Sequence, residues 1–184
     1  MICSSVNLDF LIRPSLLSKG RTLINSGGVS GGHVKRQLAG GQTIAVNAAY
    51  VQENTNLAAS LFLGDAARRR GELDSFTADA SWRKGPYGLT LGGFKTTGSA
   101  DAGIYAPEPG AGSRTGRPDS AGATLQADWT PAFAKGFIIP SGALRLGAQF
   151  TAYSKFNGAS GNYDGFGRSA ADNNTAAVFA WMAF

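Results

Sequence analysis

Residues 75–97 read SFTADASWRKGPYGLTLGGFKTT, and apolar residues alternate in them with polar or small ones on both sides of a central break. In the first half, Phe76 and Trp82 share one parity, while Asp79 and Arg83 share the other. Because successive side chains of a strand point to opposite faces, each half predicts a strand with one apolar face. The break, KGPYG, is typical of a tight turn, so the stretch predicts an antiparallel hairpin.

The same period of two recurs in the segments 43–51, 121–129, 144–153 and 176–184. Glycine is abundant, with 26 residues spread along the chain, and this favours turns and closely packed strands over long helices. With the hairpin, the pattern predicts six antiparallel strands between residues 43 and 184.

Short and long connections alternate along the chain. The long ones are rich in Gly, Ala, Ser, Asp, Asn and Arg and cover 64–73, 98–120 and 157–173. Outer-membrane barrels show this asymmetry, with short periplasmic turns and longer outer loops, and their strands need roughly 9–11 residues to cross the hydrocarbon. No stretch reaches the ~18 consecutive apolar residues of a membrane helix. The predicted fold is all-β, an antiparallel up-and-down transmembrane β-barrel. A soluble or surface-exposed β-sandwich that binds a ligand through its long loops is the alternative.

A barrel would turn the polar parity inward and the apolar parity toward lipid. The predicted lumen-lining residues are Asn47, Asp79, Arg83, Gln126, Asp128, Arg145 and Gln149. The predicted lipid-facing and girdle residues are Phe76, Trp82, Tyr87, Leu89, Leu125, Trp129, Leu146 and Phe150. The polar set would line a water-filled path or fill a small barrel as a polar plug, and its mixed charges predict no ion preference.

The chain ends in AVFAWMAF, where Val178, Ala180, Met182 and Phe184 occupy alternate positions. This resembles the C-terminal signature of bacterial outer-membrane barrels, which that family presents to its membrane-insertion machinery. The stretches YGLTLGGFKTTGSADAGIYAP, QADWTP and LRLGAQFTAYSKFNGASGNYDGFGRSAADNNT also resemble the C-terminal part of a proteobacterial family of porin-like proteins, some with a cytochrome-type description. The resemblance covers 43–184. It implies a porin-like pore or membrane scaffold in the outer membrane of a Gram-negative bacterium, in contact with the lipid bilayer and lipopolysaccharide. Assembly with further copies or with a cytochrome is a further expectation.

Residues 1–42 lie outside the resemblance and are predicted to be an irregular or unrelated leader, so that 43–184 would be the last six strands of a longer barrel. The N-terminus lacks the features of a secretory signal, and the expectation is that its start is truncated or misassigned. The alternative is that 5–13 and 20–26 add two strands and close an eight-stranded barrel. Pro14 and the weak alternation of the second segment count against it.

Several other functions find little support in the residues. One cysteine, Cys3, and one histidine, His33, provide neither a haem-attachment motif nor a metal-binding pair, so no cofactor or metal is expected. A catalytic nucleophile would lack a nearby base, so the chain is predicted not to be an enzyme. The net charge is +5, but the basic residues are scattered, which argues against nucleic-acid binding.

Two loop motifs have competing interpretations. The arginines of 68–70 are predicted to be a solvated outer loop, or a contact for lipopolysaccharide phosphates. The segment NYDGFGRSAADNN carries Asp164, Asp172, Asn173 and Asn174. Their spacing differs from that of an EF-hand, so turn formation accounts for them better than calcium binding does.

Overall fold

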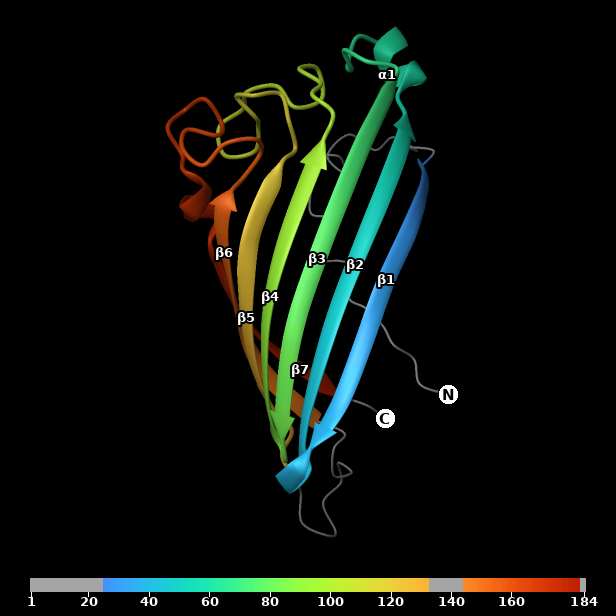
Figure 1. Cartoon of the computed structure of the whole chain (residues 1–184). Coiled ribbons are helices and arrows are strands. Elements are labelled where there is room, and N and C mark those ends of the chain that lie inside the picture. Colours follow the sequence, from blue (N-terminus) through green and yellow to red (C-terminus); the bar gives the residue numbers. More distant parts are fainter. Residues whose placement is uncertain (1–24, 133–143, 183–184) are drawn as a thin grey trace.

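The computed structural model describes residues 25–132 and 144–182, and the strands of this part form one antiparallel sheet (Figure 1). Each strand pairs with its neighbours in sequence, in the order β1-β2-β3-β4-β5-β6-β7. The strands are β1 (Asn25–Leu38), β2 (Gln42–Asn56), β3 (Arg70–Lys84), β4 (Tyr87–Gly98), β5 (Ser120–Trp129), β6 (Leu144–Lys155) and β7 (Thr175–Met182). Short helices in the links are η3 (Ala39–Gly41), α1 (Ala58–Phe62) and η4 (Ala170–Asn173). The all-β, up-and-down antiparallel arrangement is confirmed.

The links between strands separate by length, as the sequence predicts (Figure 1). Long links, 57–69, 99–119 and 156–174, gather at what we call the loop end. The links 39–41 and 85–86 lie at the opposite, turn end. In the first long link the strands reach further than expected, because β2 continues to Asn56 and β3 already begins at Arg70.

The sequence prediction is wrong about residues 25–38, which it assigned to an irregular leader. They form β1 and pair with β2 without interruption, from Asn25 opposite Thr55 to Leu38 opposite Gln42. The strand escaped notice because its residues, NSGGVSGGHVKRQL, are mostly small or polar and alternate poorly. One glycine has a packing role, since a Cβ on Gly31 would lie 2.9 Å from the Ala48 carbonyl oxygen. The sheet therefore has seven strands instead of six, while the predicted strand 5–13 lies outside the described residues.

Within the residues that the structure describes, the seven strands form one open sheet and do not close into a barrel. Within the described residues, β1 pairs with β2 alone and β7 pairs with β6 alone, so each of the two has one edge without a partner strand. Seven antiparallel strands leave the first and the last running in the same direction. Direct antiparallel pairing of β1 with β7 is therefore impossible.

Exposure alternates along the strands. The apolar side chains are the exposed ones, whereas a soluble sheet exposes its polar side chains. Along β2, for example, Ile44, Val46 and Tyr50 are exposed, whereas Ala45 and Asn47 are half-buried. A row of register partners crosses the whole sheet on the same face: Val34, Val46, Ala80, Leu91, Leu125, Phe150 and Ala176. We call this face the apolar face and the other the polar face.

Buried apolar side chains lie at the loop end instead of on the apolar face. Leu57, Ala66, Tyr163 and Ala170 are almost inaccessible to solvent, and all four belong to the long links. The long links thus have a small core of their own. Among the helices of the described residues, none is long and apolar enough to span a membrane.

Candidate functional site

Polar residues bound the apolar face at matching levels on neighbouring strands. On β2 the bounding residues are Gln42 and Gln52, and their register partners on β3 are Lys84 and Asp74. Ten residues separate the two boundaries, which is ~33 Å along a strand. At the tilt of roughly 35–45° that barrel strands adopt, this length covers about 25 Å, the height of the apolar band of outer-membrane barrels.

Aromatic side chains at both boundaries donate hydrogen bonds to the bounding residues. The Trp82 indole Nε1 donates a hydrogen bond to Gln42 Oε1 at 2.9 Å, near the turn end. Near the loop end, the Tyr50 hydroxyl donates to Asp74 Oδ1 at 2.6 Å. Aromatic rings with one apolar and one polar edge favour such a position, between an apolar layer and water.

The residues predicted to face lipid all lie on the apolar face. Their register partners connect them directly, as in the pairs Trp82–Leu89, Tyr87–Trp129 and Leu125–Phe150. All eight are exposed except Leu146, which is half-buried. Val178, Ala180 and Met182 lie on the same face of β7, and Val178 is 87% exposed. Phe184 lies outside the described residues.

The seven residues predicted to line the lumen all lie on the polar face. Register pairs Asn47 with Asp79 and Gln126 with Gln149. The face holds two clusters of charged and polar residues, one near the turn end and one midway along the strands.

The turn-end cluster has one carboxylate between two guanidinium groups. Asp128, whose side chain is 1% exposed, accepts hydrogen bonds from Arg83 Nη2 at 3.0 Å and from Arg145 Nη2 at 2.7 Å. Gly88 lies between Arg83 and Asp128 in the register, and a Cβ there would lie 2.7 Å from both carboxylate oxygens. The glycine therefore leaves the space in which the ion pairs form across β3, β4, β5 and β6.

Aromatic rings also lie against glycines of the polar face. A Cβ on Gly147 would lie 2.3 Å from the Phe179 ring, and the Arg145 guanidinium carbon lies 5.9 Å from that ring's centroid. Phe94 covers Gly122 and makes an edge-to-face contact with Tyr153, with ring centroids 5.4 Å apart. The sequence prediction does not include these rings, although glycines at polar-face positions of β5 and β6 are a usable signal.

The midway cluster joins three strands. Asn47 donates from Nδ2 to Asp79 Oδ2 at 2.7 Å, and its Oδ1 is hydrogen-bonded to His33 Nδ1. His33 lies in the segment that the sequence predicts to be an irregular or unrelated leader. Its place on β1 brings it onto the polar face, opposite Asn47.

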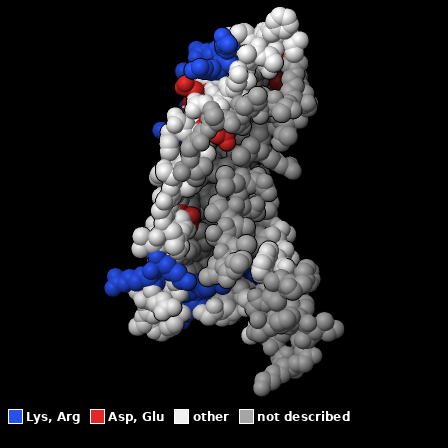
Figure 2. Space-filling view, turned by 90° about the vertical axis from the view of Figure 1, so that its right-hand side faces the viewer, with Lys and Arg blue, Asp and Glu red and all other residues white. Residues whose placement is uncertain are grey.

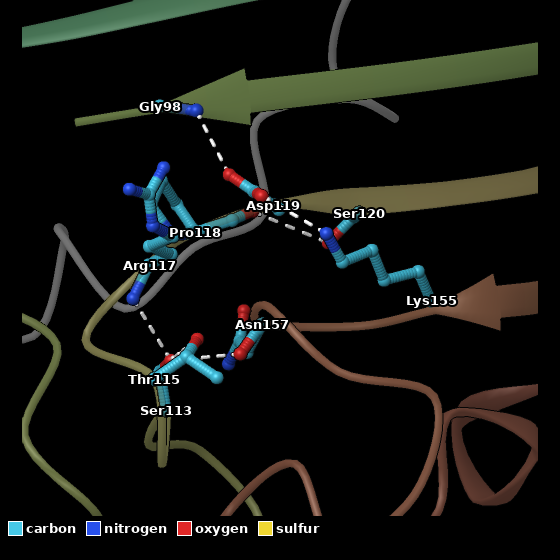
Figure 3. A network of polar contacts seen from close by, with 9 residues as sticks. All are labelled: Gly98, Ser113, Thr115, Arg117, Pro118, Asp119, Ser120, Lys155 and Asn157. Carbon is cyan, nitrogen blue, oxygen red and sulfur yellow. Dashed lines mark hydrogen bonds and ion pairs between the residues drawn. The ribbon is translucent and has the colours of Figure 1, made fainter. Parts of the chain in front are cut away.

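Buried carboxylates organise the loop end. Asp101, 3% exposed, accepts hydrogen bonds from the backbone N–H groups of Ala67, Arg68, Gly103 and Ile104. Asp119 lies between two strand ends, accepting from Gly98 N and from Lys155 Nζ, both at 3.0 Å (Figure 3). Asp101 thus joins the links 57–69 and 99–119, and Asp119 joins the ends of β4 and β6.

The calcium-like segment is built as a turn. Asp164 accepts hydrogen bonds from the backbone N–H groups of Gly110, Phe166 and Arg168. Burial acts to raise the pKa of Asp164, but these hydrogen bonds outweigh it and hold the pKa below its ordinary value. Asp172 forms a capping box with Ser169 at the start of η4. The oxygens of both carboxylates thus accept backbone hydrogen bonds.

Basic side chains gather toward the two ends of the molecule on the side of β1, with few between them (Figure 2). Arg68, Arg69 and Arg70 are exposed at the loop end, and Lys35 and Arg36 are exposed near the turn end. In the register, Lys35 and Arg36 lie opposite Ala45 and Ile44, within the levels bounded by Gln42 and Gln52.

No family model matches this chain, and no curated protein and no solved structure matches it either.

Proposed function

We propose that this chain is a porin-like outer-membrane β-barrel protein, or the C-terminal part of one, which forms a passive pore or a membrane scaffold. One observation carries the proposal. The apolar side chains are the exposed ones, and polar residues bound them at two levels that agree between β2 and β3. Water is a poor solvent for a continuous apolar face of this size, whereas hydrocarbon is a good one.

The soluble β-sandwich is less well supported. A sandwich buries one face of each sheet against a second sheet about 10 Å away. All seven strands of the described residues belong to one sheet, so the second layer would have to come from elsewhere. The tryptophan and tyrosine hydrogen bonds at the two boundaries also favour an interface with water at each end of the apolar band.

The proposed membrane orientation places the loop end outside the cell and the turn end in the periplasm. Arg68, Arg69 and Arg70 would then lie at the level of lipopolysaccharide phosphates, which guanidinium groups bind well. The alternating apolar residues of β7 would serve as the signal read by the insertion machinery. Lipid, lipopolysaccharide and that machinery are the partners of this proposal.

Fractionation of cells tests the membrane assignment. The full chain, fused to a bacterial export signal, is expected in the outer-membrane fraction and should be released by detergent but not by high salt or urea. The control is an exported soluble protein of similar size, recovered in the periplasmic fraction. Recovery of the chain itself in that soluble fraction would contradict the proposal.

Conductance across planar bilayers separates the two forms of the proposal. A pore would give stepwise increases in current after detergent-solubilised protein is added. A scaffold with a filled interior would leave the bilayer silent while the protein still inserts, which protease protection of the reconstituted chain would show.

A further inference from the structure

We propose that the turn-end cluster of the polar face binds a small oxyanion, a solute that carries a phosphate or a carboxylate group. Arg83 and Arg145, which flank Asp128, form the site. The proposal deepens the pore form of the function proposed above and rests on it. It names the class of solute that the pore would hold near its turn end.

The two guanidinium groups are the accessible part of this cluster. The Asp128 side chain is 1% exposed, whereas the side chains of Arg83 and Arg145 are 46% and 37% exposed. A solute that reaches the cluster from the polar face therefore meets exposed cations, while the carboxylate is covered. One carboxylate also neutralises only one of the two guanidinium charges, so the cluster keeps a net positive charge.

The cluster also has more hydrogen-bond donors than acceptors. Each guanidinium donates one hydrogen bond from Nη2 to Asp128, which leaves most of its N–H groups without a protein acceptor in the described part of the chain. One of these donors, Arg145 Nε, is buried. Guanidinium groups bind phosphate and carboxylate through paired N–H groups in one plane. An oxyanion would thus supply the acceptors that the cluster lacks.

Neighbouring residues prepare the site before a solute binds. The Arg145 guanidinium lies over the Phe179 ring, whose face attracts a cation and orients the side chain. Register places Thr90 and Gln126 in the next row toward the loop end. Their hydroxyl and amide groups are further donors for an oxyanion. Groups that are held in position before binding lose less entropy when the solute arrives.

The charges of the polar face are separated along the described strands. Lys35 lies in the row of Ser81, two residues from Arg83 along β3. At about 4.8 Å between strands and about 3.3 Å per residue, its backbone lies about 12 Å from that of Arg83. The carboxylates of Asp79 and Glu53 lie further toward the loop end. Strand register thus sorts the mixed charges of this face, and its turn end is basic.

Protection from an arginine reagent tests the site in the full chain, purified in detergent. The protein is treated with phenylglyoxal in inorganic phosphate, in succinate or in sodium chloride, all at the same ionic strength, and the modified arginines are mapped by mass spectrometry. We expect phosphate or succinate to protect Arg83 and Arg145 where chloride does not. The anion that protects better identifies the ligand group. Arg114, an exposed arginine of link 99–119, is the internal control and should react equally in all three solutions.

Two adjacent residues provide a matched pair of variants. Arg83→Gln and Lys84→Gln each remove one positive charge at the turn end, but Arg83 lies on the polar face and Lys84 on the apolar face. Arg83→Gln should raise the anion concentration that half-protects Arg145 by about tenfold, because a charged hydrogen-bond donor to the anion is lost. Lys84→Gln should change that concentration by less than about twofold, since its charge lies on the other side of the sheet.

Two outcomes would overturn the anion site. One is that Arg83 and Arg145 react as fast in phosphate and in succinate as in chloride. The other is that Arg83→Gln and Lys84→Gln weaken the protection equally, which would mean that only the total charge of the turn end matters. Neither result affects the membrane assignment of a chain that fractionates with the outer membrane. A chain that inserts and leaves the bilayer silent would instead contradict the pore, whatever the protection shows, so the two failures are distinguishable.

Discussion

Replacing Leu125 with arginine places a charge at the centre of the proposed membrane span. Leu125 is the register partner of Leu91, and Leu91 is the partner of Ala80. Ala80 lies six residues from Asp74 and four from Lys84, so this row lies close to the middle of the apolar band. An arginine on the lipid face of a barrel costs about 2–4 kcal/mol at the midplane and about 0–1 kcal/mol near an interface. We expect Leu125→Arg to lower the free energy of unfolding by the first amount.

The assay is reversible urea unfolding in lipid vesicles, followed by tryptophan fluorescence. The control is Gln52→Arg, which lies on the same face but at the loop-end boundary and should lose about 0–1 kcal/mol. Equal small losses, below about 0.5 kcal/mol for both variants, would mean that water bathes the whole face and would refute the reasoning. A much larger loss from Leu125→Arg in a chain that dissolves without detergent would show instead that a protein layer covers the face.

Three further predictions concern the polar face and the loop end. Asp101→Asn should cost about 1–3 kcal/mol for each backbone N–H left without an acceptor, and amide hydrogen exchange should accelerate at the links that it joins. Gly88→Ala should cost about 1–3 kcal/mol because the new methyl group displaces the Asp128 carboxylate, whereas Gly93→Ala, with its nearest atom 3.8 Å from the added Cβ, should change the unfolding midpoint little. The pKa of Asp164 is lower in the folded chain than in the unfolded one, so its stabilising contribution is full above the ordinary value of 3.8 and is lost as the pH falls through the lowered pKa. The protection of the amides of link 156–174 against exchange, relative to their intrinsic rates, should therefore be full at pH 5 and should fall below pH 3.8, and Asp164→Asn should abolish this pH dependence.

Alternation was a reliable guide where one face is apolar and the other polar. In β3 the apolar set of Phe76 and Trp82 and the polar set of Asp79 and Arg83 separate cleanly, and the structure places them on opposite faces. The same holds for the residues predicted in β2, β4, β5 and β6. Period-two patterns report the faces of a strand directly, because the backbone geometry itself has that period.

The sequence was a poor guide to β1. Its glycines and serines give no contrast between faces, so the pattern that identified the other strands was absent. What places these residues in the sheet is pairing along the full length of β2, a tertiary effect that intrinsic preference does not reveal.

The contacts of the polar face were also only partly predictable. Asp128 and Arg145 could be assigned to one face, but their ion pair depends on strand register and on the space left by Gly88. Likewise, Asp101 looks like an ordinary loop residue in the sequence. Its role arises because two links 30 or more residues apart in sequence meet at its carboxylate.

Fluorescence quenching from within the bilayer tests most directly whether lipid covers the apolar face. Single labelled cysteines at Ala78, Leu125 and Ala148 are compared with labels at Gln126 and Gln149, in vesicles containing a spin-labelled lipid. We predict strong quenching of the first three labels and weak quenching of the other two. Equal quenching of both sets would contradict a lipid-facing sheet. So would protection of the first three labels from both the lipid quencher and an aqueous quencher.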